Sequence, residues 1–60
     1  MNKYPFTIIR YLAGPVAKTQ NHACETIVEA VVRAKELAKL SQTLRVVITV
    51  TLYDTGQLHH

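Results

Sequence analysis

Residues 44–53 carry the most regular hydrophobic pattern in the chain. The even positions are Leu, Val, Ile, Val and Leu, whereas the odd positions are Arg, Val, Thr, Thr and Tyr. A repeat of two places alternate side chains on opposite sides of an extended backbone, so this segment is expected to be a half-buried β-strand. Its even side should lie on the core, and its odd side should face water or a partner.

Two further strands are expected ahead of this one. Residues 4–12 are rich in aromatic and β-branched side chains and end at Ala13-Gly14-Pro15, which is typical of a strand followed by a turn. Residues 16–22 follow this turn and include polar residues suited to an exposed edge strand. The short connection between the two segments favours a hairpin.

A helix is expected over residues 26–41. Thr26 followed by Glu29 forms a capping box, in which each side chain can accept a hydrogen bond from a backbone N–H of the first turn. At about 100° per residue, an apolar stripe forms along one side of the helix and is expected to face the sheet. The stripe consists of Ile27, Ala30, Val31, Ala34, Leu37 and Ala38. Val28 and Val32 lie outside it and add apolar surface on a neighbouring flank.

This order of elements predicts an α+β fold of ββαβ type in a single domain spanning residues 1–60. A right-handed crossover after a hairpin places the last strand beside the first, in the spatial order 2-1-3, and makes it parallel to the second. One helix then covers one face of a mainly antiparallel three-stranded sheet. The other face and the outer edge of residues 44–53 are left uncovered, and residues 57–60 are expected to form a loose tail.

The composition narrows the class of protein. Seven Lys and Arg against four Asp and Glu give a net charge of +3, which counts against an acidic mimic of DNA. No apolar run approaches the ~20 residues of a membrane span, and no secretory signal is recognisable, so a cytoplasmic location is expected. Cys24 is the single cysteine, so an intramolecular disulfide is impossible. A core this small usually needs support, and oligomerisation is the remaining way to provide it.

The uncovered surfaces favour a homodimer. The face opposite the helix is expected to combine β-branched and aromatic side chains from the first and last strands, and no proline guards the edge of the last strand. Two copies can use either the open face or the free edge. The residues expected to mediate self-association or partner binding are Ile9, Tyr11, Val28, Val32, Val47, Thr49, Thr51 and Tyr53.

Catalytic and metal-binding groups are sparse. His22 and Cys24 stand two residues apart, and such a pair can act as base and nucleophile or as two metal ligands. We expect instead that Cys24 is a small buried filler and His22 a solvated loop residue. The carboxylates form no convincing catalytic pair, and glycine occurs only at positions 14 and 56, so no enzyme, metal site or cofactor is expected. His59 and His60 are either native or the remnant of an expression tag.

Nucleic-acid binding is the alternative function. Aromatic rings and guanidinium groups on an open sheet face can stack on bases and contact phosphates. The basic residues that could serve this purpose are Arg10, Arg33, Lys35, Lys39 and Arg45. Arg10 and Tyr11 point to opposite faces of one strand, so at most one of them belongs to such a platform. The sequence contains no helix-turn-helix, zinc-finger or RNP pattern.

The segment Thr26-Ile27-Val28-Glu29-Ala30 resembles the T-x-x-E-A helix openings of compact strand-strand-helix-strand modules, among them HicB-type antitoxin domains and a small phage inhibitor of bacterial RNA polymerase. The likeness covers the capping box and the order of elements, and it transfers no functional residue. It implies that a domain of this size can act by occupying a surface of a larger machine. The sequence thus favours a non-catalytic regulatory protein that binds another protein and self-associates.

Overall fold

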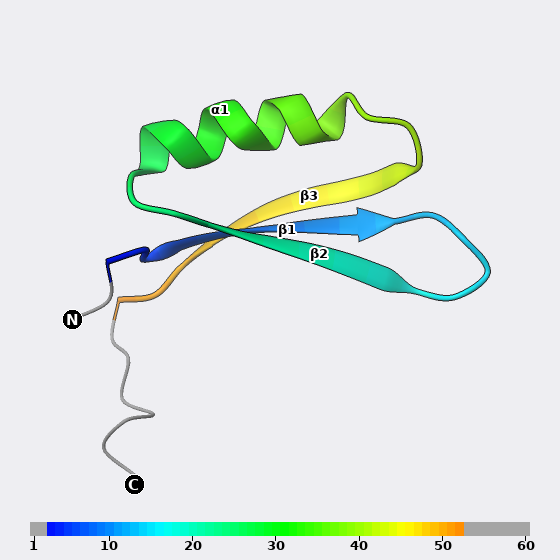
Figure 1. Cartoon of the computed structure of the whole chain (residues 1–60), viewed down its shortest axis with the longest axis horizontal. Helices are drawn as coiled ribbons and strands as arrows, with labels where there is room; N and C mark the ends of the chain where they lie inside the picture. Colours follow the sequence, from blue (N-terminus) through cyan, green and yellow to red (C-terminus); the bar gives the residue numbers. More distant parts are fainter. Residues whose placement is uncertain (1–2, 53–60) are drawn as a thin grey trace, which may run out of the picture.

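The computed structural model describes residues 3–52 of the chain (Figure 1). Within them, three strands and one helix follow the order β1 (Phe6–Leu12), β2 (Lys18–Cys24), α1 (Ile27–Ala38) and β3 (Thr43–Val50). The sheet has the order β2-β1-β3, and both outer strands run antiparallel to β1. The helix lies on one face of this sheet (Figure 1). The predicted α+β architecture and the predicted strand order are confirmed.

The boundaries of the elements differ from the predicted ones. β2 begins and ends two residues later than predicted, because the connection after β1 is a wider loop than a tight turn. Gly14 adopts a φ of 153° in this loop, a conformation that glycine reaches without a steric penalty. α1 ends at Ala38, three residues early, and β3 ends at Val50. Tyr53, which the prediction placed in the last strand, lies outside the described residues, as do the predicted tail and both C-terminal histidines.

The helix begins where the capping box predicts. Thr26 is the N-cap residue, and its Oγ1 accepts a hydrogen bond from the backbone N–H of Glu29 at 3.2 Å. The connection after the helix contains no glycine, and Gln42 instead takes the left-handed conformation with a φ of 67°. The Gln42 carbonyl accepts a hydrogen bond from the Ala13 N–H at 2.7 Å. This bond joins the residue that follows β1 to the residue that precedes β3.

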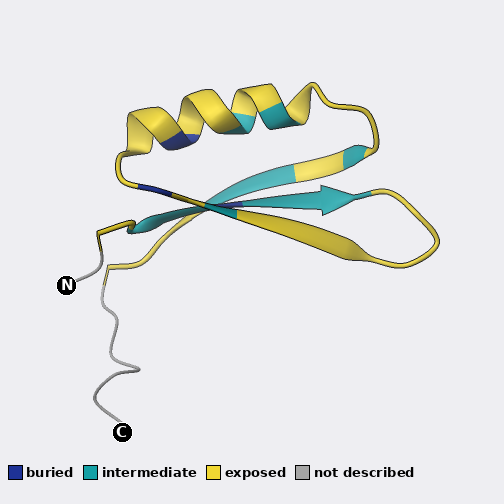
Figure 2. Ribbon diagram, viewed as in Figure 1, coloured by how far each residue is buried: buried dark blue, intermediate teal, exposed yellow. Residues whose placement is uncertain are grey.

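The core of the described chain is small (Figure 2). Ile8, Cys24 and Ala30 are its buried members, and they come from β1, β2 and α1. Partly buried side chains pack around them, namely Phe6, Ala34, Leu37, Val46 and Ile48. A core of this size supports the domain only marginally, as the length of the chain predicts.

The predicted apolar stripe of the helix is correct only in part. Ala34 and Leu37 pack on the core around the buried Ala30. Ile27 and Val31 were predicted to face the sheet, yet they are 48% and 37% exposed, and Ala38 is exposed too. Two alanines at the centre of the contact let the helix approach closely, so the contact is narrow. The flank with the larger side chains therefore stays outside it.

The even side of β3 also departs from its prediction. Val46 and Ile48 pack on the core, whereas Leu44 and Val50 are 71% and 51% exposed. Leu44 is displaced because the pairing with β1 shifts register between Tyr11 and Leu12, which inserts a β-bulge into β3 at this point. Val50 stands at the end of the strand, and Leu52 beyond it is exposed as well.

Candidate interaction surfaces

The face of the sheet opposite α1 is uncovered in the described part of the chain (Figure 1). The register places Ile9 opposite Val47, and Thr7 opposite Thr49, on this open face. The sequence predicted this juxtaposition, and the structure brings these residues together. Their role in binding a partner stays a prediction.

A stacked pair of side chains lies at one end of the open face. Tyr11 pairs with Arg45 across β1 and β3, and the guanidinium carbon of Arg45 lies 4.4 Å from the centroid of the Tyr11 ring. A cation–π contact of this kind contributes about 0.5–1 kcal/mol at an exposed site. The contact holds two planar groups together beside the aliphatic centre formed by Ile9 and Val47.

Arg10 lies on the opposite, helix-facing side of β1, and its guanidinium is used within the fold. Its Nε donates to Thr43 Oγ1 at 2.8 Å, and its Nη1 donates to Gln20 Oε1 at 2.8 Å. Its Nη2 donates to the Ser41 carbonyl at 3.1 Å. Arg10 therefore joins both outer strands and the connection before β3, rather than extending the Tyr11–Arg45 pair as the nucleic-acid alternative considered. In the sequence, the position of Arg10 among the apolar even residues of β1 was the sign that its side chain lies on the helix side of the sheet.

The outer surface of α1 combines apolar and basic side chains. Val28 and Val32 are exposed, as expected for residues outside the stripe. Arg33 and Lys35 in the second half of the helix and Lys39 at its C-cap are exposed. The first half of α1 therefore presents an apolar surface to solvent, and the second half a basic one.

The outer edge of β3 is unpaired within residues 3–52, because β3 is a terminal strand of the sheet. The Thr51 N–H donates to the Pro5 carbonyl at 2.8 Å, which identifies one bonded position in the ladder between β1 and β3. Bonded and non-bonded pairs alternate along an antiparallel ladder. The N–H and C=O groups of Val46, Ile48 and Val50 therefore point away from β1, toward the free edge.

His22 and Cys24 point to the same side of β2, toward the helix. Cys24 is buried, as predicted for a small core filler. The prediction of a solvated loop position for His22 is wrong, because β2 continues to Cys24 and His22 lies inside the strand, paired with Ile8 of β1. His22 is half-buried, and its Nε2 is buried without a hydrogen-bond partner. Among the described residues, no group of three His, Cys, Asp or Glu side chains gathers into a metal site.

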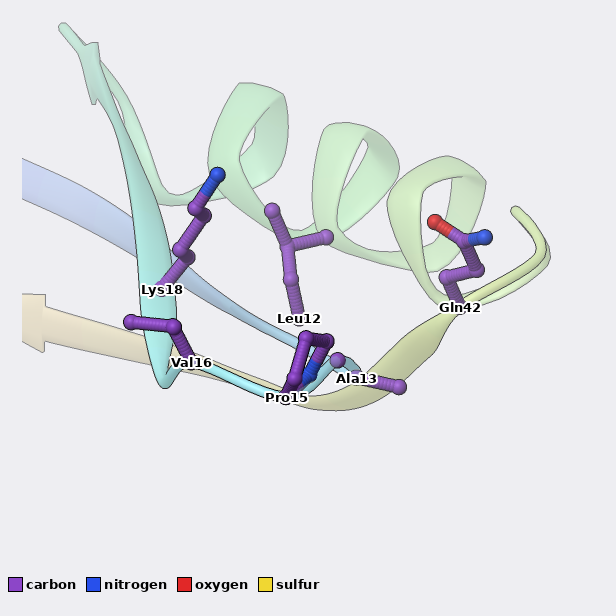
Figure 3. Close-up of a pocket in the computed structure, with 7 residues that line it drawn as sticks. Leu12, Ala13, Pro15, Val16, Lys18 and Gln42 are labelled. Carbon is purple, nitrogen blue, oxygen red and sulfur yellow. The ribbon is translucent and has the colours of Figure 1, made fainter.

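A hollow of about 280 Å³ lies beside the hairpin loop (Figure 3). Its lining comes from the loop between β1 and β2 together with Leu12, Lys18 and Gln42. This lining offers an amine and an amide, but it contains no carboxylate, thiol or imidazole. Small-molecule sites usually occupy about 300–1,000 Å³ and converge several polar groups. The chemistry of the hollow therefore supports no catalytic role.

Comparison of the chain with protein-family models, with curated proteins and with solved structures finds no significant match. Within residues 3–52, the helix is too short to cross a membrane. The open face, the outer flank of α1 and the β3 edge are therefore interpreted from their own chemistry.

Proposed function

We propose that this chain is a non-catalytic interaction protein that binds another protein and associates with itself. The observation that carries the proposal is the imbalance between its core and its uncovered apolar surface. In the described part of the chain, ten large hydrophobic side chains are exposed, whereas three hydrophobic residues are buried. Extended apolar surface on a soluble domain marks a site of interaction.

We assign partner binding to the open face of the sheet, whose apolar residues Ile9 and Val47 are half-buried and come in addition to the ten exposed side chains. Ile9 and Val47 supply an aliphatic centre, and the Tyr11–Arg45 pair supplies two of the three residue types that are enriched in binding hot spots. Among the residues of β1, β2 and β3 that point to this face, Arg45 is the one that carries a charge. The face therefore fits a protein that presents an apolar patch with a carboxylate at its rim.

The test compares Val47→Arg with Val16→Arg, a control at an exposed valine in the loop between β1 and β2. Affinity capture from a host lysate, quantified by mass spectrometry, should show proteins that bind the wild type and the control but not Val47→Arg. The added arginine would lose its water when a partner covers the open face, and this desolvation weakens binding. The variant should still fold, so its circular dichroism spectrum should match that of the wild type. Identical capture by both variants would contradict the assignment of this face.

The Tyr11–Arg45 pair favours a second candidate function, the binding of single-stranded nucleic acid. An aromatic ring beside a guanidinium can stack on a base while contacting a phosphate. Fluorescence anisotropy with mixed-sequence DNA and RNA at roughly 50 and 200 mM salt separates the two candidates, because phosphate-driven affinity falls steeply with salt. Steep salt dependence together with weaker binding by Arg45→Gln supports this second function, and no binding at the lower salt concentration excludes it.

A further inference from the structure

We propose that two copies of the chain associate through their β3 edges, about a two-fold axis at Ile48, into one continuous sheet. Each copy contributes its three strands in the order β2-β1-β3, so the assembled sheet has six strands. This inference rests on the self-association in the proposed function and gives it a defined geometry.

The free backbone groups of β3 are self-complementary about Ile48. Outward N–H and C=O groups occur at Val46, Ile48 and Val50, evenly spaced by two residues. A two-fold axis at Ile48 pairs this residue with its own copy and pairs Val46 with Val50 of the second copy. Each of these pairs can exchange two hydrogen bonds, as in any antiparallel ladder. The β-bulge at Leu44 ends the regular stretch on one side.

The charges of the two copies do not oppose this pairing. Residues 46–50 carry no charged side chain, although each chain has a net charge of +3. Arg45 stacks over Tyr11 on the open face. In the proposed register Arg45 lies opposite Thr51 of the second copy, so no like charges face each other across the edge.

The helix adds exposed apolar side chains above the outer edge of β3. α1 packs mainly over β3 and β1 and runs antiparallel to β3 (Figure 1). With a right-handed crossover from β2 to β3 and a right-handed helix, the flank that bears Ile27 and Val31 lies above the outer edge of β3. Val32 lies on the outer side of the helix, away from the sheet. The exposure of Ile27 and Val31 thus falls on the side where a second copy would lie.

The spacing of the layers fits a second copy of this chain. Neighbouring strands lie about 4.8 Å apart, so a helix above the midpoint of β1 and β3 lies about 4.8 Å from a two-fold axis just outside β3. The two helix axes would then lie about 10 Å apart, within the roughly 8–10 Å at which helices pack. A helix above the centre of β1 would give about 14 Å and leave a gap. The position of α1 over β3 and β1 therefore lets two helices pack side by side.

A disulfide test checks the register. The proposed axis places residue 47 of one copy directly opposite residue 49 of the other on the open face, in a non-bonded pair with Cα atoms about 4.5 Å apart. The double variant Val47→Cys/Thr49→Cys should form a covalent dimer on mild oxidation. Either single variant should remain monomeric on a non-reducing gel, because its new thiol meets a native residue. No covalent dimer from the double variant, or equal yields from the single variants, would overturn the register.

A second measurement tests the helix flank. Val31→Lys should weaken the dimer at least tenfold in analytical ultracentrifugation, because it places two charges in the gap between the helices. Val16→Lys, at an exposed position in the loop between β1 and β2, is the control and should change the dissociation constant by less than about twofold. Circular dichroism of both variants controls for folding. A monomeric wild type would overturn both this geometry and the self-association in the proposed function. A dimer that is disrupted by Val47→Arg, but not by Val31→Lys, would overturn the β3-edge geometry alone.

Discussion

Each of the two outer strands of the sheet has one edge that pairs with no other strand of the described residues, but the side chains of the two strands differ. β2 reads Lys, Thr, Gln, Asn, His, Ala and Cys, and most of it is exposed. β3 reads Thr, Leu, Arg, Val, Val, Ile, Thr and Val. The ladder alternation leaves outward backbone groups at Thr19, Asn21 and Ala23 of β2, just as it leaves them at Val46, Ile48 and Val50 of β3.

The difference shows how side chains decide what an unpaired edge can do. Lysine and short polar side chains keep an edge hydrated and discourage pairing, whereas an uncharged run of valine and isoleucine does not. The helix adds to the contrast, because α1 packs more closely over β3 than over β2. The β2 edge therefore serves as an internal reference for the β3 edge.

The largest effect on stability should come from Ile8→Ala, because Ile8 lies between the two outer strands and packs in the core. Ile8 is fully buried in β1 and pairs with His22 on one side and Ile48 on the other. The truncation should cost about 3–4 kcal/mol, a large part of the stability of a small domain, and urea denaturation measures this. Ile9→Ala on the open face should cost about 1 kcal/mol, because Ile9 is only partly buried. Equal losses would show that the core lies elsewhere.

Arg10→Met should have the next largest effect, because Arg10 bonds to Gln20 of β2 and to Thr43 of β3. The loss of these bonds and of the bond to the Ser41 carbonyl should cost about 2 kcal/mol of unfolding free energy. Hydrogen exchange should increase at the ends of both outer strands, which would show that this side chain couples them. Exposed Arg33→Met is the control and should change stability by less than about 0.5 kcal/mol.

Proline substitution separates the two edges directly. Val50→Pro removes an outward N–H of β3, and Asn21→Pro removes an outward N–H of β2, while neither removes a bond to β1. Two symmetry-related hydrogen bonds are lost in the Val50→Pro dimer, so its dissociation constant should rise about tenfold in sedimentation equilibrium. Asn21→Pro should leave the dissociation constant unchanged. Equal weakening by both variants would erase the proposed distinction between the edges.

The smallest effect should come from Gln42→Gly at the entry to β3. Gln42 holds a φ of 67°, which costs a residue with a side chain more than it costs glycine. The greater freedom of glycine in the unfolded chain offsets part of this gain, so the net stabilisation should be about 0.5 kcal/mol by thermal denaturation. Ser41→Gly, one residue earlier, should lower stability slightly. A loss of stability in Gln42→Gly would show that the side chain contributes more than its backbone conformation costs.

Local periodicity was sufficient for the elements and for the main features of the topology. The alternation in residues 44–53 predicted β3 and the two faces of its central residues 46–49, and the spacing of Thr26 and Glu29 predicted the start of the helix. The strand order followed from the handedness of the crossover. The pairing of Ile9 with Val47 on the open face was predictable for the same reason, since alternation assigns each residue of a strand to a face.

Only the tertiary structure decided how far each surface is covered. Ile27 and Val31 fit the apolar stripe by spacing, but their exposure depends on how closely and how far to one side the helix packs. That position is set by Ala30 against Ile8 and Cys24, which are distant in sequence. The bulge at Leu44 likewise arises from the pairing of two separate strands. The sequence by itself determined which side chains share a face, because periodicity is local; the packing of separate segments decided which faces stay open.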